Sequence, residues 1–221
     1  MCIDALGRSV PGYLHIPAVF FAKNIREEKN MSLQKTAEQQ RAAVQNSQTM
    51  RMVKLAMLVA ISIVLVYLVR FPIFPAVAFL EYDPADISIL IGTFAFGPAA
   101  GVLLTLLVSV IQGLTVSAGS GLYGILMHVI ATGALVLVAG GVYQKHKTRK
   151  MALGGLLLGM MVMSLMMLGA NLIITPLFMG VPRSAVWGLM PFIIGFNLIK
   201  AGINGAVTFL VYKRVAAFLR K

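Results

Sequence analysis

The sequence predicts an all-α membrane protein with six transmembrane helices, both termini cytoplasmic, a short second helix and an outer loop folded over a cavity. Of the 221 residues, 59% are hydrophobic and 12% are charged, whereas charged residues make up roughly 25% of ordinary soluble domains. A soluble domain of this length keeps much of its surface in water and could not bury so many apolar side chains. Several apolar segments also approach the length of about 20 residues that a bilayer requires. Soluble and disordered proteins are therefore excluded.

The chain divides at about residue 50. Residues 1–50 form a basic, polar N-terminal segment, and residues 51–221 form the six-helix transmembrane domain. The apolar stretch 13–22 is too short to span a bilayer and no small-residue cleavage site follows it, so we predict no signal peptide. Three interpretations of the first segment stay open: a disordered, solvated tail, a basic arm on anionic lipid, or an artefact of a start site that belongs at Met31 or Met50.

The first predicted span covers residues 55–69. It is short, but Lys54 and Arg70 at its ends can extend their charged groups to the membrane surface. The next segment, 71–83, is apolar and aromatic, yet it contains two prolines that break a helix. We expect it to form a loop folded back against the outer end of the helices.

A second helix is expected to begin at Asp83, which suits the N-cap, with Pro84 at the first helical position and Asp86 bonding back to the cap. The apolar run continues to about residue 117 and is interrupted at 96–98 by the sequence Phe-Gly-Pro. The first of the two resulting helices has only about 13 residues, too few to cross roughly 30 Å of hydrocarbon at 1.5 Å per residue. It must be sheltered by protein or border a cavity.

Three longer spans follow. They cover about residues 122–143, 151–177 and 186–212. A turn at 117–121 precedes the first of them, a basic loop at 145–150 the second and a break at 179–183 the third. All but three of the 19 Lys and Arg residues lie before residue 55, in the basic loop or after residue 212. Because an excess of Lys and Arg marks the cytoplasmic side of a membrane protein, we predict that both termini are cytoplasmic.

Missing motifs exclude several kinds of chemistry. The sequence contains neither the G-x-x-x-x-G-K-[ST] loop of ATPases nor the H-E-x-x-H motif of zinc peptidases. Ser120 and His128 would lie roughly 12 Å apart along a helix, too far for a nucleophile and its base. All 7 acids lie in the first 86 residues, which argues against carboxylate-driven ion pumping, and the single cysteine excludes a disulfide framework. We therefore expect no enzymatic activity, no metal or cofactor, and no nucleic-acid partner.

Lys200 is the most informative polar residue, because it lies near the middle of the last span. A lysine at the centre of a membrane helix costs roughly 2.5 to 3.5 kcal/mol on insertion scales. We expect it to lack a carboxylate partner, since the last three spans contain no acid. Asn197 and Asn204 share its helix face by their i−3 and i+4 spacing. We interpret this strip as a ligand contact in a polar cavity, with a snorkelling or carbonyl-capped lysine as the alternative.

Asn171 and Thr175 form a second polar strip near the outer end of the fifth span. A lone amide usually joins helices to one another, but its combination with Lys200 favours a binding site. Aromatic residues of the loop 71–83 form either an interfacial belt or a lid that stacks on a planar ligand. The candidate ligand-binding residues are Lys200, Asn197, Asn204, Asn171, Thr175, Gln112, Glu81, Phe79, Leu80 and Tyr82.

Ala56 and Ala60 give the first span two small residues four positions apart. This spacing allows another helix to approach closely. The other helix belongs either to a partner protein or to the same bundle.

These features together resemble the substrate-binding subunit, or S component, of energy-coupling factor (ECF) vitamin transporters. The resemblance rests on six spans with cytoplasmic ends, the small pair in the first span, the missing ATPase motif and the apolar outer loop. More narrowly, the segments FLEYDPAD at 79–86, FGPAAG at 96–101 and FNLIKAGIN at 196–204 are similar to those of the riboflavin-specific S component. The resemblance covers residues 51–213.

The resemblance implies a multi-pass protein of a prokaryotic cell membrane that binds riboflavin tightly in an outward-facing cavity. S components join a transmembrane coupling protein, the T component, and two ECF ATPases, and topple in the membrane to release the vitamin inside. Ala56 and Ala60 match the motif that meets the coupling protein. Riboflavin also suits the polar strip, because it combines a planar, acceptor-rich ring with a polyol tail and has no obligatory charge.

Other functions stay open. The nearest is an S component for thiamine, biotin or pantothenate, although an anionic vitamin requires more than one deep base and a cationic one requires Glu81 or an aromatic cage. A small intramembrane enzyme would depend on His128 or Ser120. A free-standing secondary transporter would move its solute without any ATPase.

Overall fold

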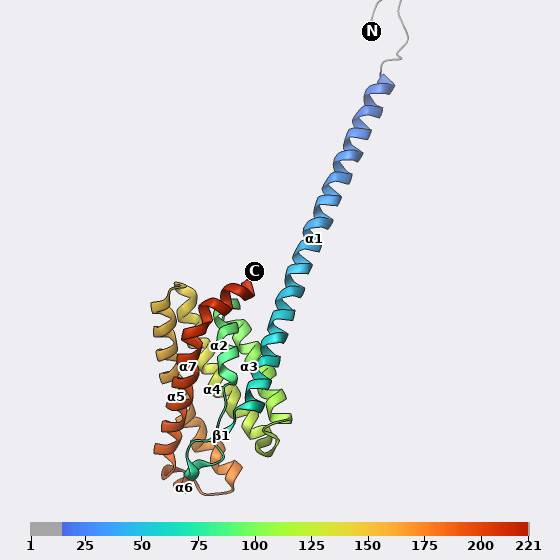
Figure 1. Cartoon of the computed structure of the whole chain (residues 1–221). Helices are drawn as coiled ribbons and strands as arrows, with labels where there is room; N and C mark the ends of the chain where they lie inside the picture. The colour runs from blue at the N-terminus through green and yellow to red at the C-terminus, as the bar shows by residue number, and fades with distance from the viewer. Residues whose placement is uncertain (1–14, 221) are drawn as a thin grey trace, which may run out of the picture. The chain divides into compact units, whose positions relative to one another are not determined.

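The computed structural model describes residues 15–220, and the chain separates into two units, Met1–Met52 and Val53–Lys221 (Figure 1). Helix α1, His15–Leu68, contributes residues to both units. In the first unit, the hydroxyl groups of Ser32, Thr36, Ser47 and Thr49 donate to backbone carbonyls three or four residues earlier. These polar side chains are therefore satisfied within the helix itself.

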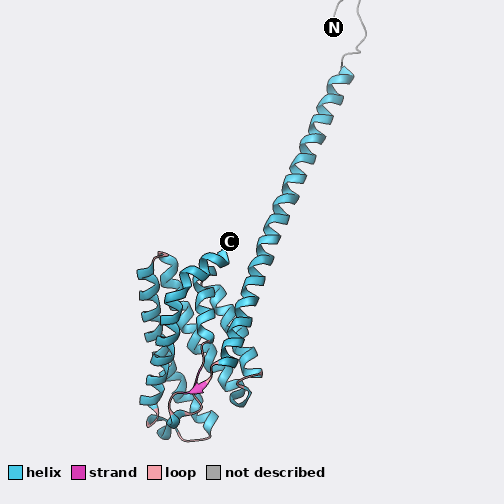
Figure 2. Cartoon of the chain, in the orientation of Figure 1, coloured by secondary structure: helices cyan, strands magenta, loops and turns pink. Residues whose placement is uncertain are grey.

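The second unit is a bundle of helices with one small hairpin (Figure 2). After α1 its elements are β1 (Phe71–Pro72), η1 (Pro75–Val77), β2 (Glu81–Tyr82), α2 (Ala85–Phe96), α3 (Pro98–Leu114), η2 (Ala118–Ser120), α4 (Gly121–Lys145), α5 (Arg149–Met179), α6 (Arg183–Trp187) and α7 (Met190–Arg220). The helical segments long and apolar enough to cross a membrane are Arg26–Leu68, Ala118–Lys145, Arg149–Met179 and Met190–Leu219. Helices α2 and α3 are apolar but shorter. The protein is therefore an all-α membrane protein, as its composition predicts.

The segment 71–83 is folded against the helices, which confirms the prediction of a folded-back loop. It forms an antiparallel hairpin in which Phe71 pairs with Tyr82, and the η1 turn lies between the strands. Val77 in that turn is fully buried and packs with Val186 and Ile193 from the last part of the chain. The hairpin is thereby attached to α6 and α7 by apolar contacts.

The predicted break at 96–98 is also confirmed. Gly97 has φ of 99°, a left-handed conformation that favours glycine, and Pro98 begins α3. At its other end α2 begins at Ala85, one residue later than expected, with Pro84 as the N-cap residue. Asp83 still assists the start of the helix, because its Oδ1 accepts from the Ala85 amide at 3.2 Å.

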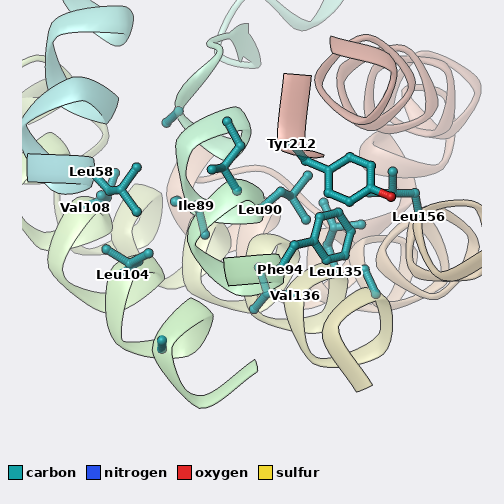
Figure 3. Close-up of a cluster of buried hydrophobic side chains, with 14 of the residues drawn as sticks. Leu58, Ile89, Leu90, Phe94, Leu104, Val108, Leu135, Val136, Leu156 and Tyr212 are labelled. Carbon is teal, nitrogen blue, oxygen red and sulfur yellow. The ribbon is translucent and has the colours of Figure 1, made fainter. Parts of the chain in front are cut away.

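The 12-residue helix α2 lies at the centre of the core (Figure 3). Ile89 and Leu90 are fully buried, and the ring of Phe94 packs 4.7 Å from that of Tyr143 and 5.2 Å from that of Tyr212. The short helix is thus sheltered by protein rather than by lipid, as its length requires.

The start of the last span differs from the prediction. A single helix was expected from residue 186, but the chain first forms the short helix α6, Arg183–Trp187, and then begins α7 at Met190. Pro182 precedes α6 and Pro191 lies in the first turn of α7. Proline is tolerated in the first turn of a helix, so each proline marks a separate helix start.

Candidate ligand-binding site

A cavity of about 130 Å³, partly open and lined by many polar side chains, lies between the hairpin and helices α3, α4, α5 and α7. The predicted residues that line it are Lys200, Asn197, Gln112, Glu81, Phe79 and Leu80. Asp83, His128 and Arg70 also line it and were not predicted.

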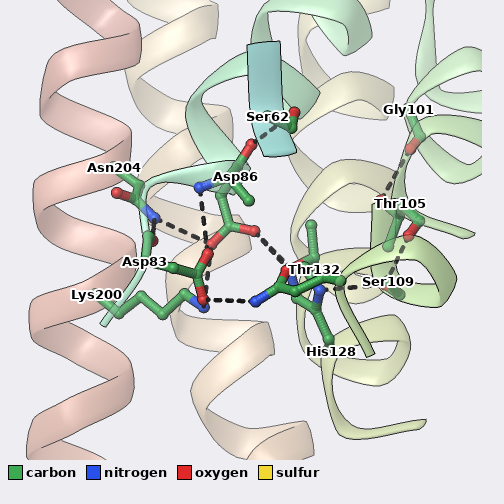
Figure 4. A network of polar contacts seen from close by, with 12 residues as sticks. Ser62, Asp83, Asp86, Gly101, Thr105, Ser109, His128, Thr132, Lys200 and Asn204 are labelled. Atoms are coloured by element: carbon green, nitrogen blue, oxygen red, sulfur yellow. Dashed lines mark hydrogen bonds and ion pairs between the residues drawn. The ribbon is translucent and has the colours of Figure 1, made fainter. Parts of the chain in front are cut away.

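Lys200 has a carboxylate partner, so the expectation that it lacks one is wrong. Its Nζ lies 2.8 Å from Asp83 Oδ2 and 4.0 Å from Asp86 Oδ2 (Figure 4). The prediction considered only the neighbouring long spans, whereas the fold places the start of α2 beside the middle of α7. Because Lys200 is only 7% exposed, the pair is a buried salt bridge and its charges compensate each other in a nonpolar environment.

Asp86 was expected to bond back to the cap of α2, but its carboxylate instead organises the network around this pair. Its Oδ1 accepts from the Thr132 hydroxyl at 2.7 Å and lies 3.3 Å from His128 Nε2. Its Oδ2 accepts from Asn204 Nδ2 at 3.1 Å. Asp86 is fully buried, and these partners replace the water that a carboxylate loses on burial. The network joins α2 to α4 and α7.

Asn204 and Tyr82 support the network and do not line the cavity. Asn204 Nδ2 also donates to the backbone carbonyl of Asp83 at 3.0 Å, and its Oδ1 accepts from the Tyr82 hydroxyl at 2.9 Å. Burial, and secondly the nearby Asp83 carboxylate, raises the pKa of the Tyr82 phenol, so this group stays protonated and able to donate. The predicted strip therefore shares one face, but only Lys200 and Asn197 reach the cavity.

The Asn171–Thr175 strip is satisfied internally. Asn171 Nδ2 donates to the Met167 carbonyl at 2.8 Å, and its Oδ1 accepts from the Thr175 hydroxyl at 2.8 Å. Thr175 borders a second, apolar cavity of about 80 Å³, which adjoins the first through Phe79 and Leu80. Its further apolar lining comes from Tyr123, Met127, Met167, Ile174 and Phe178. A polar and an apolar compartment therefore lie side by side.

Arg70 connects the hairpin to the turn that follows α3. Its guanidinium forms an ion pair with Glu81 and donates to the backbone carbonyl of Val116. Glu81 is thus engaged at the rim of the cavity rather than free for a cationic ligand. The sequence offered a signal for this contact, because Arg70 directly precedes the loop 71–83 and Glu81 is the first acid within it.

Ser109, His128 and Asp86 are arranged as a relay, but their surroundings do not favour catalysis. Ser109 Oγ lies 3.2 Å from His128 Nδ1 and donates to the Thr105 carbonyl at 2.6 Å. The serine sits inside α3, where helical hydrogen bonds occupy the neighbouring backbone amides, so these amides are not free to act as oxyanion donors. Ser120, the serine weighed from the sequence, also borders the cavity. The arrangement suits binding of a polar molecule.

Ala56 and Ala60 are exposed on α1, whereas Leu58 and Val59 between them, and Leu55 just before them, are buried. The small pair therefore takes no part in the packing of its own bundle. It presents a surface that another helix could approach.

Comparison with known proteins agrees with this architecture. The family model "ECF transporter, substrate-specific component" matches residues 50–212. The riboflavin transporter RibU of Staphylococcus aureus is 29% identical over 185 residues, covering 79% of this chain and 94% of that protein. RibU of Streptococcus thermophilus is 30% identical over 184 residues, covering 78% and 86%. A solved structure of the S component of a bacterial ECF transporter has a TM-score of 0.68 at 30% identity, covering 79% of this chain and 99% of its own. The chain therefore belongs to the family of ECF transporter substrate-specific components and is a transport subunit rather than an enzyme.

Proposed function

We propose that this protein is the riboflavin-binding subunit of an ECF-type transporter. The observation that carries the proposal is the pair of adjoining cavities, one polar around Lys200 and Asn197 and one apolar around Phe79 and Phe178. Riboflavin has the same division: one edge of its ring carries two methyl groups, and the other edge and the ribityl chain carry oxygen and nitrogen. The naming of relatives at about 30% identity as riboflavin transporters supports the same ligand.

The charges around the polar cavity favour a neutral ligand over an anionic vitamin. Lys200 and Arg70 are matched by Asp83, Asp86 and Glu81. Each cation therefore already has a carboxylate, and a carboxylate on biotin or pantothenate would meet no uncompensated positive charge. Lys200 Nζ has three donors, so it can hold Asp83 and still donate to a carbonyl or ring nitrogen of a flavin.

We assign the predicted residues to two roles. Lys200, Asn197, Gln112, Phe79, Leu80, Glu81 and Thr175 line the two cavities and contact the vitamin. Asn204, Asn171 and Tyr82 hold these residues in place through the bonds described above.

We further propose that the chain crosses the cell membrane six times with both ends in the cytoplasm, and that it assembles with a T component and two ECF ATPases. The exposed pair Ala56 and Ala60 supports a helix contact with the T component. The lack of a P-loop in this sequence supports ATP hydrolysis by partner subunits. The grouping of Lys and Arg at the two ends and in the loop 145–150 supports the orientation.

Riboflavin binding by the purified protein in detergent tests the proposal. Bound riboflavin should give a yellow sample, and titration should quench the fluorescence of the vitamin without added ATP or metal. Thiamine, biotin and pantothenate serve as competitors that should leave the quenching unchanged. If micromolar riboflavin is not quenched and another vitamin binds, the assignment of the ligand is wrong.

A further inference from the structure

Buried polar atoms without a hydrogen-bond partner are uncommon in proteins, and each calls for a reason. Among the residues whose side chains the structure describes, four such atoms remain: Gln112 Oε1, Ser164 Oγ, Thr208 Oγ1 and Tyr212 OH. Gln112 differs from the others because it lines the polar cavity together with Lys200 and Asn197, whereas Ser164, Thr208 and Tyr212 line neither of the two cavities described above. Its side chain is 8% exposed, so water does not readily satisfy the oxygen.

The neighbours of Gln112 determine which end of its amide stays free. Its Nε2 lies 3.4 Å from Asp83 Oδ2 and 3.4 Å from Ser117 Oγ. A carboxylate can only accept hydrogen bonds, so the NH₂ end must face Asp83, since the reversed amide would bring two acceptors together. Asp83 is itself fixed by the salt bridge with Lys200 at 2.8 Å. The carbonyl oxygen Oε1 is therefore the end that remains without a partner.

We propose that Gln112 Oε1 accepts a hydrogen bond from an N–H or O–H group of the bound ligand, and that Asp83 is the positioning residue that presents this oxygen. The inference rests on the proposed riboflavin-binding function. Lys200 can only donate, so it recognises acceptors of the ligand, and Gln112 adds recognition of a donor. A ligand that lacks this donor leaves a buried acceptor unpaired, which is how a polar site rejects close analogues.

Riboflavin offers two kinds of donor to Gln112: the imide N–H of its ring and the hydroxyl groups of its ribityl chain. Two analogues separate them. Lumiflavin keeps the ring N–H and lacks the ribityl chain, whereas N3-methylriboflavin keeps the chain and lacks the ring N–H. If the donor is the ring N–H, replacing Gln112 should weaken the binding of lumiflavin but not that of N3-methylriboflavin. If the donor is a ribityl hydroxyl group, the replacement should weaken the binding of N3-methylriboflavin but not that of lumiflavin.

The test compares Gln112→Met with the parent protein by fluorescence titration in detergent. Methionine keeps the length of the side chain and removes both polar ends. The Kd for riboflavin should rise about tenfold, which corresponds to about 1.4 kcal/mol, and the same rise should appear for only one of the two analogues. Thr208→Val is the matched control, because it removes an unpartnered atom that lines neither cavity and should leave the Kd unchanged.

Two outcomes overturn the inference: an unchanged riboflavin Kd in Gln112→Met, or an equal loss of affinity for riboflavin and both analogues. Thermal unfolding without ligand shows whether the variant is folded, and Gln112→Leu replaces it if it is not. If the parent protein itself does not bind riboflavin, the proposed function is wrong and the inference is wrong with it. If the parent binds riboflavin and only the comparison of variants fails, the inference alone is wrong.

Discussion

Lys200→Met should destabilise the protein and weaken riboflavin binding, and the structure explains the two effects separately. Removing one partner of a buried ion pair leaves an uncompensated charge and costs roughly 3 to 5 kcal/mol. Here Asp83 Oδ2 would lose the ammonium at 2.8 Å, and Asp86 would lose the same charge at 4.0 Å. At roughly 2 to 4 °C per kcal/mol for a chain of this size, the unfolding midpoint should fall by about 6 to 20 °C.

The double variant Asp83→Asn/Lys200→Met separates stability from binding. It removes both charges of the closest pair, so most of the lost stability should return, because no unpaired carboxylate remains at position 83. Riboflavin affinity should not return. It should stay weaker by roughly 1.5 to 3 kcal/mol, the range for a hydrogen bond to a charged group.

The assay is thermal unfolding of the unliganded protein in detergent, followed by fluorescence titration with riboflavin. Lys213→Met is the matched control, because it makes the same substitution at an exposed position of the same helix and should change neither quantity. A Lys200→Met protein as stable as the parent would refute the structural part of the reasoning. Recovery of affinity in the double variant would show that Lys200 acts only by ordering the site, not by touching the ligand.

Three further predictions address the partner surface, the hairpin and the supporting network. The double variant Ala56→Leu/Ala60→Leu should abolish riboflavin uptake by the assembled transporter and leave the Kd for riboflavin within a few-fold. Val64→Leu, at another exposed position of α1, is the control. Loss of riboflavin binding would contradict the assignment of the pair to a partner contact. Arg70→Gln should speed riboflavin dissociation a few-fold in stopped-flow measurements, because it removes the ion pair with Glu81 and the bond to Val116 that hold the hairpin to the turn after α3. An unchanged dissociation rate would show that the hairpin does not gate the cavity. Tyr82→Phe should lower stability by about 1 kcal/mol through one lost hydrogen bond, measured by thermal unfolding, whereas a large loss of affinity would make Tyr82 a ligand contact.

Some helix limits could be predicted because local chemistry sets them, whereas the first helix begins at His15, well before the predicted start of the first span at residue 55. The break at Gly97 and Pro98 and the folded segment 71–83 follow from residues that cannot continue a helix. The separate helix α6 was missed, since a five-residue helix leaves no periodic pattern in the sequence.

The salt bridge of Lys200 could not be predicted from spacing, because its partner Asp83 is 117 residues away in sequence. Helical periodicity shows which side chains share a face, but not what that face meets. Asn171 and Thr175 illustrate the limit, because their i, i+4 spacing serves a hydrogen bond between the two. A signal did exist for Lys200: Asp83 and Asp86 are the last acids of the chain and stand at the start of a helix too short and apolar to lie in water.

The distance in sequence between α2 and its counter-ion bears on how the protein is made. A ribosome adds roughly 5 to 20 residues per second, so the 117 residues that separate Asp83 from Lys200 take about 6 to 23 seconds to synthesise. During that interval the carboxylates of Asp83 and Asp86 lie at the start of α2 without the positive charge of Lys200. We therefore expect the central helix to complete its packing only after the last helix has been synthesised, because until then Asp83 lacks the lysine that compensates its charge.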